Sequence, residues 1–349
     1  MKVVSIVGAR PQFIKASPIS RLLRQQHTEI LVHTGQHYDE NMSDVFFEEL
    51  EIPTPEYHLG VGSASHGAQT GAMLIGIEEL LVKEKPDWVL VYGDTNSTLA
   101  GALAASKLHF KVAHVEAGLR SFNHEMPEEI NRIVADHLST LLFCPSQTAV
   151  NNLANEGITQ GVHLVGDVMA EALAFAANKA KTHSDILSQL SLSEGKYLLA
   201  TVHRAENTDD PIRLRNIIEA FNTIQEPIVF PVHPRTQKEI NKLHYSLDDH
   251  VLMLEPLGYL DMVRLEASAR VILTDSGGIQ KEAYWLGVPC VTLRNETEWV
   301  ETVETDWNKL TGANSNKIVY TIHNINPPKS HPNLYGDVNT ASRCVALLT

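Results

Sequence analysis

Residues 271–293 read VILTDSGGIQKEAYWLGVPCVTL, and this stretch decides the fold class. An apolar strand ends at Asp275, Ser276–Gly278 forms a turn, a helix begins near Ile279, and a second apolar strand follows. The first helical N–H groups and the positive end of the helix dipole then face a ligand, and the glycines allow a phosphate to approach the backbone. Glu282, expected on the first turn, can accept hydrogen bonds from a ribose. The alternative is that these residues only cap the helix.

Strand patterns alternate with helical patterns along the whole chain, the helices being clearest at 17–26, 67–84, 96–107 and 127–139. Apolar strands with helical crossovers indicate parallel sheets covered on both faces. The two series therefore predict an α/β protein with two Rossmann-like, doubly wound domains. The predicted strands cover residues 3–8, 29–34, 88–93, 112–116, 140–144 and 162–166 in the first half, and 197–202, 228–232, 251–254, 271–274, 290–293 and 309–311 in the second.

The break between the two strand series sets the expected domain organisation. We predict a first domain over residues 1–168, a linker over 169–195, and a second domain over 196–337. A final helix within 338–349 is expected to pack back on the first domain.

Composition excludes several classes of protein. The chain has 349 residues, 43% of them hydrophobic, which is globular and too long for one ordinary core. A net charge of −14 argues against a nucleic-acid or anionic-membrane partner, and no apolar stretch is long enough to span a bilayer. The first residues form a strand pattern rather than a leader peptide. Cys144, Cys290 and Cys344 are far apart, which fits a reducing cytoplasm, and no metal-ligand motif occurs.

Polar or glycine-rich groups follow seven of the predicted strands. In open α/β sheets, ligands bind at the carboxyl ends of the strands, so these groups predict a ligand cleft between the two domains. They are Gly8–Gln12, Thr34–His37, Gly93–Thr95, Glu116–Arg120, Thr201–Arg204, His233–Arg235 and Thr274–Gly278.

Arg10 follows the first strand and is a second candidate for binding phosphate. Pro11 favours the first turn of a helix, which leaves Gly8–Arg10 as the loop. A surface salt bridge is the alternative role for Arg10. Neither G-x-G-x-x-G nor G-x-x-x-x-G-K-[ST] occurs here, so the sequence does not favour a dinucleotide oxidoreductase or a P-loop nucleotidase.

Titratable groups at the strand ends are candidates for proton transfer. Asp94 and Glu116 each end a buried strand, where a carboxylate must be paired or desolvated. Glu128 begins a helix and has the alternative role of a dipole partner; Glu129 is expected to be its solvated neighbour. His203 ends a strand together with a cation, a carboxylate and an amide. No Gly-x-Ser-x-Gly elbow is present, so acyl-enzyme chemistry is not expected. These groups suit a nucleotide-diphosphate ligand whose far end is acted on by acids and bases.

Seven ordered motifs between the first strand and Gly312 resemble the non-hydrolysing UDP-N-acetylglucosamine 2-epimerase family. They are GARPQFIK (8–15), TGQH (34–37), GDT (93–95), HVEAGLR (114–120), PEEINR (127–132), HRAEN (203–207) and TDSGGIQ (274–280). The resemblance implies a GT-B fold with a central cleft, a homodimer, and interconversion of UDP-GlcNAc and UDP-ManNAc without NAD or metal. It also implies elimination of UDP to 2-acetamidoglucal followed by re-addition, in the cytoplasm, for bacterial cell-surface polysaccharide synthesis.

The same resemblance implies roles for individual residues. The catalytic set is Asp94, Glu116, Glu128 and His203, and which of them removes the C2 proton stays open. The substrate-binding set is Arg10, Lys15, Gln36, His37, Gln69, Arg204, Asn207, His233, Ser276, Gly277, Gly278 and Glu282.

Departures from the family pattern leave alternatives. GARPQ stands where many members read GTRPE, and GDTNST and RSFN resemble the branch acting on UDP-2,3-diacetamido-2,3-dideoxy-glucuronic acid. The stretch His66–Gln69 lacks the basic residue of members that are activated by their own substrate, which does not favour such activation here. A GT-B glycosyltransferase and a non-catalytic nucleotide-sugar binder are the more distant readings.

Overall fold

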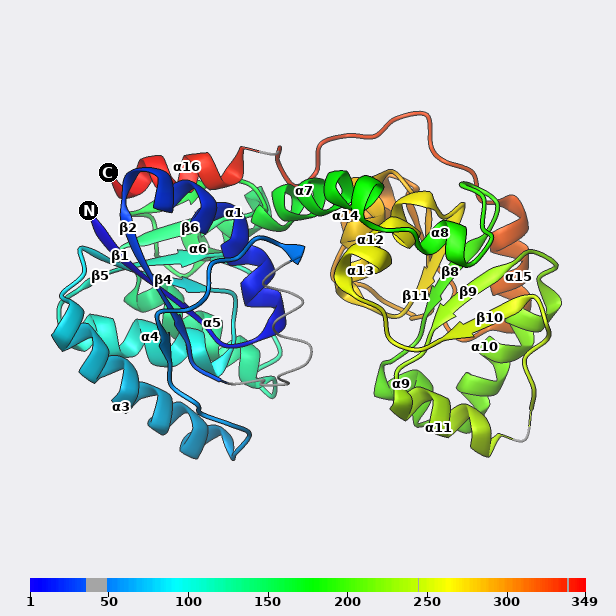
Figure 1. Ribbon diagram of the computed structural model, residues 1–349, viewed down its shortest axis with the longest axis horizontal. Coiled ribbons are helices and arrows are strands. Elements are labelled where there is room, and N and C mark those ends of the chain that lie inside the picture. Colours follow the sequence, from blue (N-terminus) through cyan, green and yellow to red (C-terminus); the bar gives the residue numbers. More distant parts are fainter. Residues whose placement is uncertain (36–48, 244, 338) are drawn as a thin grey trace. The chain divides into compact units, whose positions relative to one another are not determined.

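The computed structural model describes residues 1–35, 49–243, 245–337 and 339–349, and it divides the chain into two compact units (Figure 1). Unit 1 comprises Met1–Ala174 and Asn333–Thr349, and unit 2 comprises Phe175–Pro332. The chain passes from the first to the second unit within α7 (Val168–His183), so a helix occupies much of the segment that we expected to be a linker.

Unit 1 is built on a seven-stranded parallel sheet with the order β3-β2-β1-β4-β5-β6-β7. Its central strand β4 (Trp88–Tyr92) is apolar and buried along its whole length because helices cover both faces of the sheet. The strands are β1 (Lys2–Val7), β2 (Thr28–His33), β3 (Tyr57–His58), β4 (Trp88–Tyr92), β5 (Lys111–Val115), β6 (Leu141–Cys144) and β7 (Val162–Leu164).

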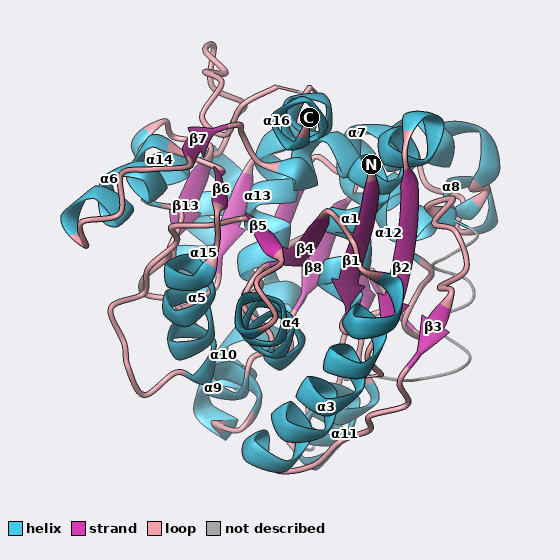
Figure 2. Cartoon of the chain, turned by 90° about the vertical axis from the view of Figure 1, so that its left-hand side faces the viewer, coloured by secondary structure: helices cyan, strands magenta, loops and turns pink. Residues whose placement is uncertain are grey.

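The two helical layers of unit 1 contain different parts of the sequence. Figure 2 shows α3, α4 and α5 on one side of the sheet, while α1 and the C-terminal helix α16 lie beside each other on the other side. The Trp88 indole Nε1 donates a hydrogen bond of 2.9 Å to the Leu348 carbonyl, which fastens α16 to β4. The helices are α1 (Arg10–Gln26), α3 (His66–Glu84), α4 (Asn96–Lys107), α5 (Pro127–Leu138), α6 (Gln147–Asn155) and α16 (Thr340–Leu348).

Unit 2 repeats the doubly wound pattern with a six-stranded parallel sheet of order β10-β9-β8-β11-β12-β13. The strands are β8 (Leu198–Thr201), β9 (Ile228–Pro231), β10 (Val251–Leu254), β11 (Val271–Thr274), β12 (Cys290–Thr292) and β13 (Asn308–Leu310). The helices are α8 (Ile186–Gln189), α9 (Ala205–Thr208), α10 (Pro211–Thr223), α11 (Pro234–Lys242), α12 (Tyr259–Ser268), α13 (Gly277–Leu286), α14 (Val300–Glu304) and α15 (Ser315–Asn324).

Helix α1 begins at Arg10 with Pro11 on its first turn, where the sequence predicted the turn, and it continues through Pro18, so the clear periodicity over 17–26 covers only its second part. Its buried face packs on the sheet, and this packing outweighs the poor helix propensity of proline. The edge strand β3 was not expected, since it has only two residues, Tyr57 and His58.

Each sheet has a topological switch point, where the chain order reverses between two neighbouring strands. It lies between β1 and β4 in unit 1 and between β8 and β11 in unit 2. Doubly wound sheets bind their ligands outside the carboxyl ends of these strands. Residues that follow β1 and β4, and those that follow β8 and β11, are therefore the first to consider as site residues.

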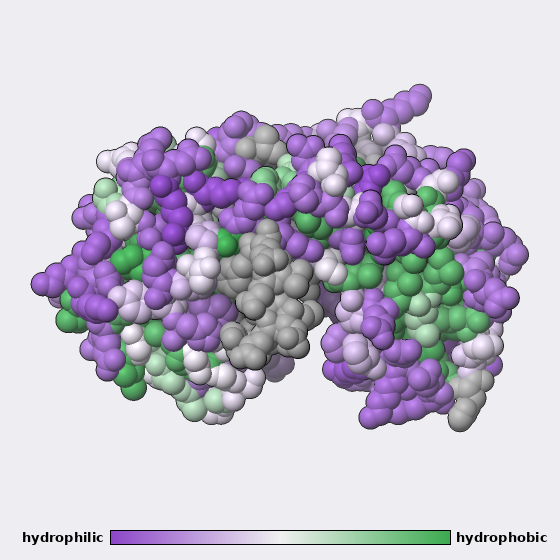
Figure 3. Space-filling model, in the orientation of Figure 1, coloured by the Kyte–Doolittle hydropathy of each residue, from purple (hydrophilic) through white to green (hydrophobic). Residues whose placement is uncertain are grey.

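Polar side chains cover most of the surface visible in Figure 3. Among the described residues, no helix has both the length and the apolar character needed to cross a membrane.

Candidate active site

A part-buried ion pair joins Lys15, on the second turn of α1, to Glu116, which follows β5. Gly93, which follows β4, lies against this pair, because a Cβ atom added to it would lie 3.1 Å from Lys15 Nζ and 3.3 Å from Glu116 Oε2. Burial works against the charge of Lys15, but attraction by Glu116 and Asp94 outweighs it and raises the pKa of Lys15 above its ordinary value. The ammonium group is thus held protonated beside the two acids.

Asp94 follows Gly93 at the start of α4 and forms an ion pair with Arg132 of α5. Its backbone carbonyl accepts a hydrogen bond of 2.9 Å from Asn131 Nδ2. The side chain of Asp94 is partly exposed, at 32%, so one carboxylate face stays open to solvent. The paired carboxylate expected from the sequence is present at this strand end, with Arg132 as a partner that the sequence reasoning had not assigned.

The backbone of Glu116 adopts a left-handed conformation with φ of +73°, which costs free energy for a residue other than glycine. The turn is held by hydrogen bonds of 3.1 Å from the N–H groups of Glu116 and Ala117 to the Phe143 carbonyl. The next N–H, of Gly118, donates to Asp136 Oδ2 at 3.1 Å. These contacts direct the Glu116 side chain back toward Lys15.

Of the two neighbouring acids Glu128 and Glu129, the second is the buried one. Glu128 is exposed on the first turn of α5, whereas Glu129 is 1% exposed. Glu129 accepts hydrogen bonds of 2.9 Å from the N–H groups of Ser121 and Phe122 and from Arg132. Burial alone would raise its pKa, but these bonds hold the pKa of Glu129 below its ordinary value. Glu129 was wrongly expected to be solvated, because the sequence does not show that the 121–122 turn needs an acceptor.

Gln69 of α3 is buried, and its amide is used within unit 1. It donates to the Gly62 carbonyl at 3.1 Å and accepts from Asn96 Nδ2 at 2.8 Å. Asn96 Oδ1 in turn accepts from Asn131, which also holds the Asp94 carbonyl. The structure therefore links Gln69 to the Asp94 turn through two amides. Gln36 and His37 lie outside the described residues, as does the side chain of Arg10.

In unit 2, helix α13 begins at Gly277 directly after β11, with Ser276 as its N-cap. Ser276 Oγ accepts from Ile279 N at 3.5 Å, and Gly278 is exposed at the free end of the helix. Glu282 is the sixth residue of α13 and is 9% exposed, so the expectation that it lies on the first turn was wrong. The helix starts two residues earlier than expected, because Gly277 and Gly278 are helical rather than part of the turn.

Asp275 is fully buried at the end of β11 and organises the segment that follows β8. Its carboxylate accepts hydrogen bonds from the backbone N–H groups of His203 and Arg204, each at 3.1 Å, and from Asn207 Nδ2 at 3.0 Å. Asn207 is fully buried, and its Oδ1 accepts from Arg213. The sequence reasoning assigned no site role to Asp275. Its signal was a charged residue at the end of an apolar strand, as for Asp94.

Two of the predicted site residues of unit 2, His203 and Arg204, lie next to this buried carboxylate. The His203 side chain is 50% exposed, with Nε2 3.8 Å from Asp275 Oδ1. A Cβ atom added to Gly277 would lie 3.8 Å from an Arg204 guanidinium nitrogen, so the start of α13 and Arg204 are neighbours. His233 is exposed as the N-cap of α11. In unit 2, the structure thus brings His203 and Arg204 to the start of α13.

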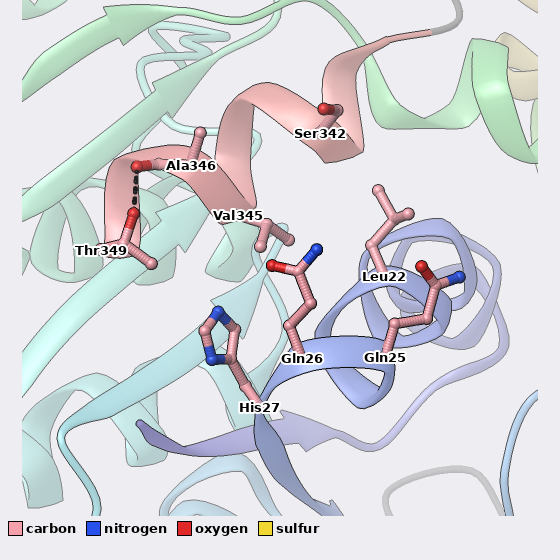
Figure 4. Close-up of a pocket in the computed structure, with 8 residues that line it drawn as sticks. All are labelled: Leu22, Gln25, Gln26, His27, Ser342, Val345, Ala346 and Thr349. Carbon is pink, nitrogen blue, oxygen red and sulfur yellow. Dashed lines mark hydrogen bonds between the residues drawn. The ribbon is translucent and has the colours of Figure 1, made fainter.

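Two pockets lie away from these residues. One is lined by residues of α1 and α16 together with His27, next to the start of β2 (Figure 4). The other lies near the starts of β8, β11 and β12. Both are at the amino ends of their sheets, opposite the candidate residues. Among the described residues, no group of three or more His, Cys, Asp or Glu side chains is arranged to hold a metal ion.

Residues 21–349 match the model of the UDP-N-acetylglucosamine 2-epimerase family. The chain belongs to this family. It is 57% identical to a UDP-N-acetylglucosamine 2-epimerase homolog of Methanococcus maripaludis, covering 100% of this chain and 99% of that one. It is 54% identical to the UDP-2,3-diacetamido-2,3-dideoxy-D-glucuronate 2-epimerase of Pseudomonas aeruginosa, over 91% of this chain and 90% of the relative.

Solved structures of family members agree with this assignment. The crystal structure of the Methanocaldococcus jannaschii UDP-GlcNAc 2-epimerase in complex with UDP-GlcNAc and UDP has a TM-score of 0.86 to this chain at 44% identity. The match covers 100% of this chain and 99% of that one. The predicted family and the predicted α/β fold class, with two Rossmann-like domains of the GT-B type, are confirmed.

Proposed function

We propose that the chain is a non-hydrolysing UDP-N-acetylglucosamine 2-epimerase, an isomerase that interconverts UDP-GlcNAc and UDP-ManNAc. The observation that carries the proposal is the pair of acids, Asp94 and Glu116, next to the unit 1 switch point, each beside a cation. Positioned carboxyl groups are among the side chains that act as general acids and bases. Family membership supplies the substrate class.

The reaction removes the hydrogen at C2 of the sugar as a proton and breaks the bond between C1 and the UDP oxygen. The electron pair of the C2–H bond forms the double bond of 2-acetamidoglucal, and UDP leaves with the electrons of the C1–O bond. Re-addition of UDP at C1, with a proton delivered to the opposite face of C2, gives the epimer. We assign the proton transfers to Asp94, Glu116, Glu128 and His203, because transfer on two faces needs more than one acid or base.

Departure of UDP develops negative charge on the diphosphate. We assign its stabilisation to the start of α13, where the backbone N–H groups of Gly277 and Gly278 and the helix dipole favour an anion, whereas Ser276 N donates to Thr274 Oγ1 at 2.9 Å. Arg204 is the neighbouring cation in unit 2. Lys15 is the cation of unit 1 that accompanies the acids. Arg10, Gln36, His37 and His233 stay predictions as binding residues.

The test incubates the protein with UDP-GlcNAc in deuterated water and follows the sugar by proton NMR. We expect the C2 proton signal to disappear while UDP-ManNAc accumulates, since the proton returned to C2 comes from solvent. Asp94→Asn and Glu116→Gln should abolish both changes. Glu128→Gln and Glu125→Gln are a matched pair of exposed acids three residues apart, and only the first should slow the exchange. Unchanged C2 signals with every UDP-sugar offered would reject the epimerase.

One relative motivates the test of a second substrate within the same mechanism. The chain is 54% identical to the P. aeruginosa UDP-2,3-diacetamido-2,3-dideoxy-D-glucuronate 2-epimerase and 44% identical to the structurally characterised UDP-GlcNAc 2-epimerase of M. jannaschii. The deuterium experiment should therefore be run with both sugars in parallel. The sugar with the higher kcat/KM is the substrate; sugar transfer to an acceptor without exchange at C2 would identify a glycosyltransferase instead.

We also propose that the enzyme is a cytoplasmic homodimer that supplies a nucleotide sugar for cell-surface polysaccharide synthesis. The three buried free thiols, Cys144, Cys290 and Cys344, fit a reducing compartment. Light scattering on the purified protein tests the dimer. Polysaccharide analysis of a deletion strain tests the pathway, and cell fractionation tests the location.

A further inference from the structure

His114 is a fully buried histidine of β5 to which the proposed reaction gives no role. Its Nδ1 lies 2.7 Å from Asp136 Oδ1, and its Nε2 lies 2.7 Å from the Gly93 carbonyl oxygen. A carbonyl oxygen and a carboxylate oxygen only accept hydrogen bonds. A neutral imidazole has one N–H and can satisfy one of these two oxygens, whereas an imidazolium satisfies both.

The proton between His114 Nδ1 and Asp136 Oδ1 is carried by the imidazole and not by the carboxyl group. Asp136 Oδ2 accepts from Arg120 Nη1 at 2.7 Å and from Gly118 N at 3.1 Å, which favours the carboxylate form. Arg120 also pairs with Glu156 at 2.6 Å. A charged His114 therefore balances two carboxylates with two cations.

The contacts of this pair lie at the two turns that carry the proposed acids. The carbonyl held by His114 belongs to Gly93, directly before Asp94. The N–H held by Asp136 belongs to Gly118, two residues after Glu116. His114 and Asp136 thus connect the turn after β4 to the turn after β5 at the carboxyl end of the sheet. Both turns contain residues with positive φ values, Gly93 in the first and Glu116 and Gly118 in the second.

We propose that His114 is a doubly protonated imidazolium and that it forms, with Asp136, a positioning pair that holds the turns carrying Asp94 and Glu116 in register. The pair makes no hydrogen bond or ion pair with either acid side chain, so His114 and Asp136 act through the backbone of the turns. The charge state stands on the hydrogen-bond geometry alone. The kinetic consequence rests on the proposed function.

Nitrogen-15 NMR of histidine-labelled protein tests the charge state without any substrate. The His114 signals are assigned by their loss in His114→Phe. We expect both ring nitrogens to carry slowly exchanging protons and to have imidazolium shifts at neutral pH. A His114 ring with one unprotonated nitrogen would overturn the charged form.

The variant Asp136→Asn tests whether the pair holds the two turns through its hydrogen bonds or needs the charge of His114. An asparagine can donate to Nδ1 of a neutral imidazole and still accept from Gly118 and Arg120, so every hydrogen bond is kept. We expect His114 to become neutral in this variant and turnover to recover relative to Asp136→Ala. His114→Phe should lower kcat about 100-fold, as expected for displaced catalytic groups, with KM and UDP affinity unchanged. His137→Phe, on the exposed face of the same helix, is the control and should keep native kinetics.

The outcomes distinguish this proposal from the proposed function. If the native protein exchanges no C2 proton with either sugar, the epimerase fails while the NMR result still decides the charge of His114. If the native protein is an epimerase but folded His114→Phe keeps its kcat, or if Asp136→Asn is no better than Asp136→Ala, the positioning role is wrong. Circular dichroism and cooperative unfolding establish that each variant is folded.

Discussion

Lys15 and Glu116 are 101 positions apart in the sequence, yet their side chains form a part-buried ion pair next to the Gly93–Asp94 turn. Exposed ion pairs contribute little stability, whereas a buried charge that loses its partner is costly. The pair lies between these limits, since the two side chains are 13% and 12% exposed. It therefore couples the stability of unit 1 to the placement of a proposed catalytic acid.

Lys15→Met removes the cation and leaves the Glu116 carboxylate without it. We expect a loss of about 2 kcal/mol in the free energy of unfolding, because a partly buried charge keeps its desolvation penalty. The double variant Lys15→Met/Glu116→Gln should recover part of this loss. Urea denaturation of both single variants and the double variant gives the coupling energy. Additive effects would show that the two side chains do not interact in solution.

Gly93→Ala should disturb the same region by steric contact. Gly93 has φ of +61°, and an added Cβ would lie 3.1 Å from Lys15 Nζ, so both backbone strain and crowding follow. Gly157→Ala is the matched control, since Gly157 has φ of +79° with no atom within 4 Å of the added Cβ. We expect both variants to lose about 1 kcal/mol from strain, and only Gly93→Ala to lose C2 exchange as well. Equal rates of C2 exchange in the two variants would show that the added methyl group at Gly93 does not disturb Lys15 and Glu116.

Asp275→Asn tests the organising role of the buried carboxylate in unit 2. The asparagine would place an amide N–H group among three donors, from His203, Arg204 and Asn207. We expect a loss of about 1–3 kcal/mol in stability and weaker binding of UDP by titration calorimetry. Asp210→Asn is the control, because Asp210 is the N-cap of α10, where asparagine serves equally well. A native UDP affinity in Asp275→Asn would show that Asp275 and its hydrogen-bond donors do not contribute to nucleotide binding.

The buried His33 makes the free energy of unfolding depend on pH. Burial, and then the charge of the stacked His58, lower the pKa of His33 from 6.5 to about 4. The unfolded chain binds this proton near pH 6.5 and the folded chain only near pH 4, so stability is lost as the pH falls between these values. The full loss is about 3 kcal/mol.

His33→Asn is the variant that checks this dependence, since its Oδ1 can replace Nδ1 as the acceptor of Gly35 N. We expect the difference in unfolding free energy between native protein and His33→Asn to shrink as the pH falls from 6.5 to 4. A difference that stays constant over this range would show that His33 does not titrate with unfolding.

Much of the fold was predictable from local patterns. Apolar runs such as WVLVY at 88–92 located every strand except β3. The start of helix α1 was predictable from Pro11, whereas its continuation through Pro18 depends on packing on the sheet, which is a tertiary effect. The error in the expected exposure of Glu129 has a tertiary origin. Ile130 is 50% exposed beside a buried glutamate, so hydropathy alone predicts the wrong face.

The sequence by itself determined the two strand series, the family, and the chemical types present at the strand ends, because these depend on residue order and local propensity. The partners of those residues were decided only by the tertiary structure. Lys15 with Glu116, Arg132 with Asp94, and His114 with Asp136 all meet through the crossing of distant elements. The physical reason is that a parallel sheet brings carboxyl ends of strands from different parts of the chain to one edge, and no local sequence pattern records which side chains then come into contact.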